Sequence, residues 1–247
     1  MNKQEREKAL SIITKWYRCF GINYVFSDIS TGITEAYGRS SGADSTAAGK
    51  LQTQRSHVEN SGAISGSFET LADLRSFIMK TDVCGLKSTS RNTVFADGDM
   101  EANIMIIGEA PGEEEDIQGK PFVGQSGKLL NNMLKAVGFN RENTYITNIL
   151  FWRPPANRTP STDEIAKCLP YVLKHIEFIA PKALLLLGGV AIKAITNSSG
   201  SISSMRSKSL KHNGIDVITT FHPAYLLRSP SQKASSFLDM LKLRKLL

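Results

Sequence analysis

Four short apolar runs, each bounded by turn residues, constrain the fold of this chain more than any other feature. They occupy residues 103–107, 144–150, 183–187 and 216–221. Runs of this length and composition are typical of strands covered on both faces. Amphipathic helical patterns alternate with them, at residues 70–80, 126–137, 161–179 and 189–196. The alternation predicts an α/β fold, a three-layer α/β/α sandwich with a central four-stranded parallel sheet.

The chain is longer than this domain requires. It has 247 residues, of which 41% are hydrophobic, so residues 68–247 can bury a sizeable core. Residues 39–67 are rich in Ser, Gly and Ala, which predicts a flexible linker. Residues 1–38 form a predicted N-terminal helical extension, with apolar residues at helical spacing over 7–20. An amphipathic helix of this kind needs a partner surface for its apolar face.

Charge and cysteine usage narrow the class of partner and the compartment. The formal net charge is +7, which favours an anionic partner. Nucleic acid is preferred to a membrane, because there is no strongly amphipathic basic helix and no apolar run of about 18 residues. Cys19, Cys84 and Cys168 are odd in number and irregularly spaced, which is typical of a reducing compartment. We therefore expect a cytoplasmic, monomeric protein, consistent with a bacterial cytosol.

Three loops carry the candidate chemistry, because ligands of parallel sheets bind outside the carboxyl ends of the strands. The first loop reads Gly108-Glu109-Ala110-Pro111-Gly112 and continues into an acidic run. Glycines directly after a strand let backbone amides approach a ligand. Neither the dinucleotide fingerprint nor the P-loop spacing is present. By itself, the acidic run is more typical of a solvated helix start than of a site.

The second and third loops supply an amide, an imidazole and several cations. Asn148 ends an apolar strand, and its donor and acceptor match the edge of a pyrimidine. Arg153 and Arg158 lie on a loop stiffened by prolines, where they can hold phosphates. A lone histidine such as His222 is more often structural. Here, however, three strands deliver polar residues to one edge of the sheet. The third loop ends in an apolar pair beside a cation, as in a wedge that enters a base stack: Leu226, Leu227 and Arg228.

Three sequence blocks in this order resemble the signatures of the type 4, iron-sulfur uracil-DNA glycosylases. They are GEAPGEEEDIQGKPFVGQSGKLL, TNILFWRPPANRTPSTDEIAKCLPY and HPAYLLR, and the resemblance spans residues 80–247. It implies a DNA repair enzyme that flips uracil out of DNA and hydrolyses its N-glycosidic bond, leaving an abasic site.

The resemblance also implies how the base is held. Phe122 stacks on the flipped uracil, Asn148 hydrogen-bonds its polar edge and rejects cytosine, and His222 faces the carbonyl O2. Negative charge accumulates on O2 as the glycosidic bond breaks, and a preorganised donor there typically lowers the barrier by about 3 kcal/mol. The first loop contributes further base-binding positions: Gly108, Ala110 and Pro111.

The remaining implied roles concern the attacking water and the DNA. Glu109 is the first candidate for positioning the water, with Glu115 and Asn157 as second choices. Three arginines are expected to contact phosphates: Arg153, Arg158 and Arg228. Leu226 or Leu227 is expected to fill the gap left by the extruded base.

The chain departs from the family at the metal site. Members typically hold a four-iron four-sulfur cluster on four cysteines. Cys84 and Cys168 occupy two of these positions, whereas Thr81 and Trp152 stand at the other two. Two thiolates cannot complete that ligation, so we expect no stably bound cluster, with Trp152 filling the vacated volume.

Two other functions compete with the glycosylase. One is a DNA-binding or replication-associated module of the same fold with weak or lost activity. The other is a nucleotide-binding metabolic enzyme of similar sheet topology. The combination of Phe122, Asn148 and His222 favours the glycosylase.

Overall fold

The computed structural model describes residues 66–247, which fold around one mixed six-stranded sheet. The strand order is β1-β3-β2-β4-β6-β5. The strands are β1 (Asp97–Gly98), β2 (Ile104–Gly108), β3 (Tyr145–Asn148), β4 (Ala183–Leu187), β5 (Leu210–His212) and β6 (Ile215–Thr220). The predicted N-terminal extension and most of the predicted linker, residues 1–65, lie outside the described residues.

The four central strands are parallel, as the sequence predicts, and two short antiparallel strands extend the edges. Gly108 of β2 pairs with Asn148 of β3, and Leu187 of β4 pairs with Thr220 of β6. The carboxyl ends of the parallel strands therefore lie at one edge of the sheet. β1 pairs with β3, and β5 with β6. The α/β class is confirmed, but the prediction of four strands omitted these two edge strands.

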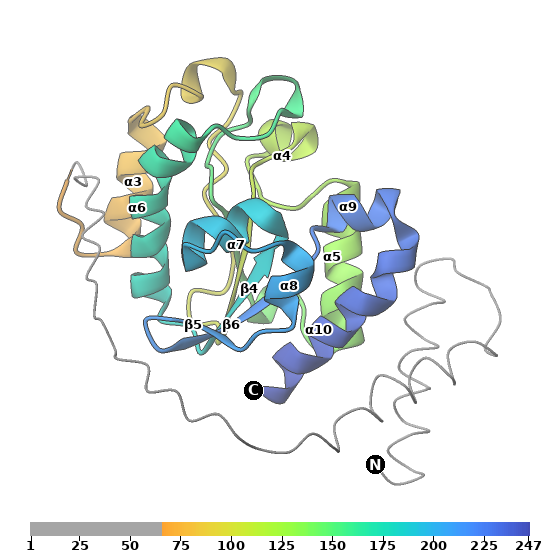
Figure 1. Cartoon of the computed structure of the whole chain (residues 1–247). Helices are drawn as coiled ribbons and strands as arrows, with labels where there is room; N and C mark the ends of the chain where they lie inside the picture. Colours follow the sequence, from red (N-terminus) through yellow and green to blue (C-terminus); the bar gives the residue numbers. More distant parts are fainter. Residues whose placement is uncertain (1–65) are drawn as a thin grey trace, which may run out of the picture. The chain divides into compact units, whose positions relative to one another are not determined.

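Helices cover both faces of the sheet. In Figure 1, α3 and α6 lie on one side of the strands, and α5 and α10 lie on the other. The α-helices are α3 (Leu71–Lys80), α4 (Glu113–Gln118), α5 (Gln125–Ala136), α6 (Thr162–Ile179), α7 (Gly188–Thr196), α8 (Ile202–Arg206), α9 (Pro223–Arg228) and α10 (Lys233–Lys245). The 3₁₀ turns are η1 (Lys87–Thr89), η2 (Arg141–Asn143), η3 (Pro155–Asn157) and η4 (Pro230–Gln232). Among the described residues, no helix is long and apolar enough to cross a membrane.

Every residue of β2 and β4 is buried, which explains why these runs are continuously apolar. Successive side chains of each strand point to opposite faces of the sheet and pack against the helices on each face. Met105 and Ile107 of β2 belong to the core cluster that includes residues of α3, α6 and α7. Ile104 and Ile106 are equally buried but outside that cluster, as are Leu130 and other residues of α5.

Helix starts follow the capping rules closely. Thr70 caps α3 and Ser161 caps α6, where Ser161 and Glu164 form a capping box. The final helix, α10, was not predicted, because its apolar residues do not form one clear stripe. It nevertheless buries Phe237, Met240 and other side chains.

Among the buried polar side chains of the described residues, one histidine in the core makes no hydrogen bond through either ring nitrogen. His175 of α6 is fully buried, and both ring nitrogens are unbonded. Its ring lies 4.2 Å from that of Phe95 and within 6.0 Å of those of Tyr145 and Phe151, centroid to centroid. Burial lowers the pKa of His175 to about 3, so the imidazole is neutral at pH 7.

Candidate active site

A cavity of about 460 Å³ lies where the parallel strands end. Three segments far apart in the sequence line it: the loop after β2, the loop after β3, and the start of α9. The structure brings ten of the predicted residues together in its wall: Glu109, Ala110, Pro111, Glu115, Phe122, Asn148, Asn157, Arg158, His222 and Arg228. Its volume falls in the range of small-molecule sites.

Phe122 forms an aromatic wall of this cavity in an unusual backbone conformation. Its φ is 53°, in the left-handed region that a bulky side chain rarely adopts, at a typical cost of about 1–3 kcal/mol. The side chain is buried, and its ring centroid lies 5.6 Å from that of His222. Gly108 leaves room for the ring, since a Cβ there would lie 2.5 Å from Phe122 Cζ.

Asn148 ends β3 with its side chain almost completely buried, at 1% exposure. No described protein group donates a hydrogen bond to its Oδ1. A buried amide oxygen without a partner typically costs about 1–3 kcal/mol, so native structures rarely retain one without a reason. Because Asn148 lines the cavity, a ligand with an N–H group at this place would satisfy the oxygen.

His222 is the N-cap of α9 and is held as a neutral imidazole. Its Nδ1 accepts a hydrogen bond from the Ala224 N–H at 3.2 Å, which leaves the proton on Nε2. Burial and, to a lesser extent, the nearby Arg228 cation lower the pKa of His222 to about 4, against the opposing effect of Glu115. At neutral pH the ring can therefore donate a hydrogen bond through Nε2 without carrying a charge.

The two carboxylates of the first loop have different environments. Glu109 lines the cavity, and burial raises the pKa of its carboxyl above the usual value. Glu115 of α4 uses both oxygens on the backbone of its own loop. Its Oε1 accepts from the Val123 and Gly124 N–H groups, each at 2.8 Å, and its Oε2 accepts from Gly112 at 3.1 Å. Glu109 is thus the carboxylate available to a water.

The acidic run that opens α4 is only half solvated. Glu113 and Glu114 are exposed, as expected for a helix start, but Glu115 and Asp116 are buried. Asp116 Oδ1 accepts from the backbone N–H groups of Arg91 and Asn92 at 2.8 and 3.1 Å. The buried half of the run therefore fastens neighbouring loops, which the acidic composition did not predict.

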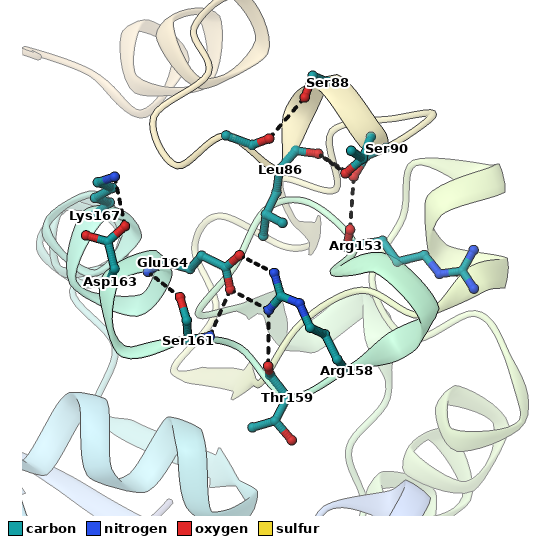
Figure 2. Close-up of polar contacts among 12 residues, drawn as sticks. Leu86, Ser88, Ser90, Arg153, Arg158, Thr159, Ser161, Asp163, Glu164 and Lys167 are labelled. Atoms are coloured by element: carbon teal, nitrogen blue, oxygen red, sulfur yellow. Dashed lines mark hydrogen bonds and ion pairs between the residues drawn. The ribbon is translucent and has the colours of Figure 1, made fainter.

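The proline-rich loop after β3 is anchored to the start of α6, as Figure 2 shows. Arg158 donates to both oxygens of Glu164, at 2.8 and 2.5 Å. This pairing lowers the pKa of Glu164 to about 2. Arg153 donates to Asn157 Oδ1 at 2.8 Å, and its carbonyl accepts from Ser90 at 3.2 Å. Both arginines therefore stiffen the loop.

The third loop separates its two leucines. Leu226 is fully buried, whereas Leu227 is 45% exposed beside the exposed Arg228. Only Leu227 is therefore accessible to enter a base stack. Tyr225, 37% exposed, also lines the cavity and packs its ring 5.2 Å from that of Phe221.

Sequence reasoning missed part of the cavity wall. Tyr225 lies one helical turn after His222, so its spacing alone was a usable signal. Ser126, Thr159 and Pro154 also line the cavity, and they follow within a few residues of predicted positions. Gly108, which was predicted, lies behind Phe122 and Asn148 rather than in the lining.

Similarity to known proteins identifies the family of this chain. Residues 95–242 match the model of the uracil DNA glycosylase superfamily. The chain belongs to this superfamily. The type-4 uracil-DNA glycosylase of Archaeoglobus fulgidus is 38% identical over 186 residues, covering 72% of this chain and 94% of that protein. Its namesake in Thermotoga maritima is 40% identical over 158 residues, covering 63% and 82% respectively. The resemblance to the type 4 family is confirmed.

The cysteine region of this glycosylase family member does not fit a four-cysteine cluster. Cys168 is buried, and Cys84 packs against the same core and hydrogen-bonds its thiol. That hydrogen bond, together with burial, raises the pKa of Cys168, while it lowers the pKa of Cys84. Within residues 66–247, no group of three or more His, Cys, Asp or Glu side chains could hold a metal ion.

The residues that stand at the other two cysteine positions of the family, Trp152 and Thr81, make hydrogen bonds within the protein. Trp152 is fully buried, and its indole Nε1 donates to Thr93 Oγ1 at 2.9 Å. Thr81 caps the end of α3, where its N–H donates to the Phe77 carbonyl at 2.8 Å. Neither side chain supplies a thiolate, so the residues present do not match the usual ligand set.

Proposed function

We propose that this protein excises uracil from DNA by hydrolysing the N-glycosidic bond of a flipped nucleotide. Membership of the superfamily and similarity to proteins named type-4 uracil-DNA glycosylase support this function. The observation that carries it is one cavity lined by Asn148, whose Oδ1 has no partner, by Phe122 and by the neutral His222.

Selection for uracil follows from the unpaired oxygen of Asn148. Uracil carries a hydrogen on N3 that can donate to Oδ1, whereas cytosine N3 carries a lone pair that would repel it. The side-chain amide can in turn donate to the uracil O4. A cytosine in the cavity would leave the buried amide oxygen unsatisfied, and such a mismatch is disfavoured strongly.

His222 stabilises the leaving group. As the glycosidic bond breaks, its electrons pass to the uracil ring and negative charge develops on O2. The Nε2–H of His222 donates to that oxygen, and the Ala224 N–H holds the ring in the required tautomer. Because the lowered pKa of its protonated form keeps His222 neutral, the remaining Nε2–H stabilises the anion without transferring its proton.

Glu109 completes the reaction from the opposite side of the sugar. Its carboxylate orients a water toward the anomeric carbon and accepts a proton from it as the new C–O bond forms. Burial raises the pKa of Glu109, so its basicity exceeds that of an exposed carboxylate. The products are an abasic site and the uracil anion, which takes up a proton from solvent once it is released. Asn157, whose Oδ1 is bonded to Arg153, serves the shape of the loop.

DNA binding falls to the exposed part of the cavity rim. Arg228 lines the cavity and is available to contact a phosphate, and the adjacent, exposed Leu227 is available to occupy the space of the extruded base. Arg153 and Arg158 bind phosphate through the guanidinium N–H groups that are not used in hydrogen bonds within their loop.

The test is excision from oligonucleotides that contain one uracil, single-stranded and in duplexes with guanine or adenine. We expect alkali-labile abasic product from the protein, and little or none from Asn148→Ala. His212→Ala serves as the matched control, because His212 lies on β5 and bonds the Ile195 carbonyl.

Two results would contradict the proposal. Salt-dependent DNA binding without any abasic product would favour a binding module of the same fold. A melting temperature raised by free nucleotides but not by DNA would favour a metabolic enzyme.

We also propose that the protein needs no iron-sulfur cluster. The misfit at Trp152 and Thr81 supports this, because the indole fills its site and bonds Thr93. Anaerobically purified protein should contain no stoichiometric iron, and chelator treatment should leave its activity unchanged. Four irons per chain, with the accompanying charge-transfer absorbance, would refute the idea.

The setting of the reaction completes the proposal. We place the enzyme in the cytoplasm as a monomer that acts on DNA. Docking of the N-terminal segment on a repair or replication protein stays a prediction, since that segment lies outside the described residues.

A further inference from the structure

Arg141 contacts the backbone on both sides of Phe122, although it does not line the cavity. Its Nη2 donates to the Pro121 carbonyl at 2.8 Å, and its Nη1 donates to the Phe122 carbonyl at 3.0 Å. These carbonyls belong to the two peptide planes whose rotation defines the φ and ψ angles of Phe122. One guanidinium therefore restrains both angles.

Glu115 holds the other end of the second peptide plane. The Phe122 carbonyl points to the Arg141 cation, and the following Val123 N–H donates to the Glu115 carboxylate at 2.8 Å. The same carboxylate binds the Gly124 N–H at 2.8 Å. The peptide between Phe122 and Val123 is thus clamped between opposite charges, which form stronger hydrogen bonds than neutral groups do.

Arg141 is itself oriented by the edge strand β1. Its Nε donates to Asp97 Oδ2 at 2.9 Å, and Nη2 approaches the same oxygen at 2.5 Å. Both side chains are mostly buried, with 23% and 28% exposure. Gly98 allows β1 to lie close to the Thr144 backbone, because a Cβ at position 98 would lie 1.9 Å from the Thr144 carbonyl oxygen. β1 thereby fixes the direction of the guanidinium.

We infer that Arg141 is a positioning residue of the glycosylase: with Glu115, it holds Phe122 in the left-handed conformation that makes its ring the stacking wall for the base. The inference rests on the proposed function, since it assigns Arg141 a task in uracil recognition. Gly127 fits the same arrangement, because a Cβ there would lie 1.9 Å from the Phe122 carbonyl. Without the clamp, Phe122 relaxes to an ordinary φ and its ring leaves the cavity wall.

A double-mutant cycle between Arg141→Ala and Phe122→Ala tests the inference. Loss of stacking on one base should reduce kcat/KM by roughly 10- to 100-fold in Phe122→Ala. Arg141→Ala should cause a similar loss in the Phe122 background but less than about twofold further loss in the Phe122→Ala background. Full multiplication of the two losses would overturn the inference, because Arg141 would then act independently of the ring.

Two variants control for general damage to the fold. Asp97→Asn keeps the guanidinium on both carbonyls and should lose less activity than Arg141→Ala. Lys174→Ala removes a surface ion pair with Glu177 and should match the parent protein. If Arg141→Ala does not fold, Arg141→Lys replaces it in the cycle, since an ammonium keeps the charge without the planar fork; the same non-additivity is then expected.

A crystal structure of Arg141→Ala, or of Arg141→Lys, decides the inference even if the parent protein yields no abasic product. We expect Phe122 to leave the left-handed region and its ring to move away from His222. An unchanged φ and ring position would overturn the inference, whereas absence of excision by the parent protein would contradict the proposed function alone.

Discussion

The cavity lined by Phe122, Asn148 and His222, here called the base pocket, differs from the region around Cys84 and Cys168, the cysteine region. The difference lies in how their buried polar groups are satisfied. In the pocket, Asn148 Oδ1 accepts no hydrogen bond from a described protein group, and Phe122 adopts a strained backbone conformation. In the cysteine region, the indole nitrogen of Trp152 donates a hydrogen bond to Thr93, and the free thiols of Cys84 and Cys168 hydrogen-bond each other.

This difference separates a surface built for a ligand from one built for packing. An unpaired buried acceptor and a strained aromatic residue both cost stability, and they persist where a substrate makes use of them. A satisfied indole in a close-packed core has no such requirement. The pocket should therefore respond to mutation mainly in activity, and the cysteine region mainly in stability.

The largest expected effect is on stability, at Trp152. Replacement by Ala empties a fully buried site and leaves Thr93 without its partner, so the free energy of unfolding should fall by about 3–5 kcal/mol. Denaturant titration measures this. Trp152→Phe, which keeps most of the volume, should lose much less. A small loss in Trp152→Ala would mean that the region is not packed as described.

A comparable effect on catalysis is expected at His222. His222→Ala should lower kcat by roughly 10²- to 10³-fold, because it removes a donor to the developing anion. The melting temperature should change little. Single-turnover excision separates this chemical step from product release. If kcat is retained while the melting temperature falls, His222 acts mainly on stability, as we expect of the cysteine region, and not on catalysis.

Acid should destabilise the fold through its buried histidines. The pKa values of His175 and His222 lie near 3 and 4 in the folded protein, below the usual 6.5 or so in an unfolded chain. Stability from these groups is complete above about pH 6.5 and is lost as pH falls towards 4, because the unfolded state binds more protons. Melting curves from pH 7 to 4.5 should show this decline. His175→Phe, which removes one group, should show a shallower one.

The smallest expected effect separates the two leucines of the third loop. Leu227→Ala should reduce excision from duplex DNA by roughly 10-fold, with less effect on single strands, since a wedge matters only where a base stack must be opened. Leu226→Ala should instead lower stability, because Leu226 is fully buried. Equal losses on both substrates in Leu227→Ala would argue against a wedge.

Local patterns predicted much of the fold. Continuous apolar runs located the four parallel strands, and the amphipathic pattern over residues 161–179 located α6. The edge strand Asp97–Gly98 could not be predicted, because two residues carry no periodicity and their pairing depends on β3. α10 was missed because its apolar residues face several neighbours.

The site was predictable where one residue's chemistry is sufficient, as for Asn148 or His222. It was not predictable where function depends on contacts across the chain. Arg141 acts on carbonyls about 20 positions away, and nothing in its local sequence distinguishes it from a surface arginine. Glu115 likewise looked like a solvated helix residue until its three amide partners were placed.

The unpaired oxygen of Asn148 has a consequence for turnover. It binds the N3–H of uracil equally well before and after the base is cut from the sugar. Free uracil therefore retains affinity for the cavity once catalysis is over, and its departure competes with rebinding. An enzyme of this design should be inhibited by its own released base and should slow as that base accumulates.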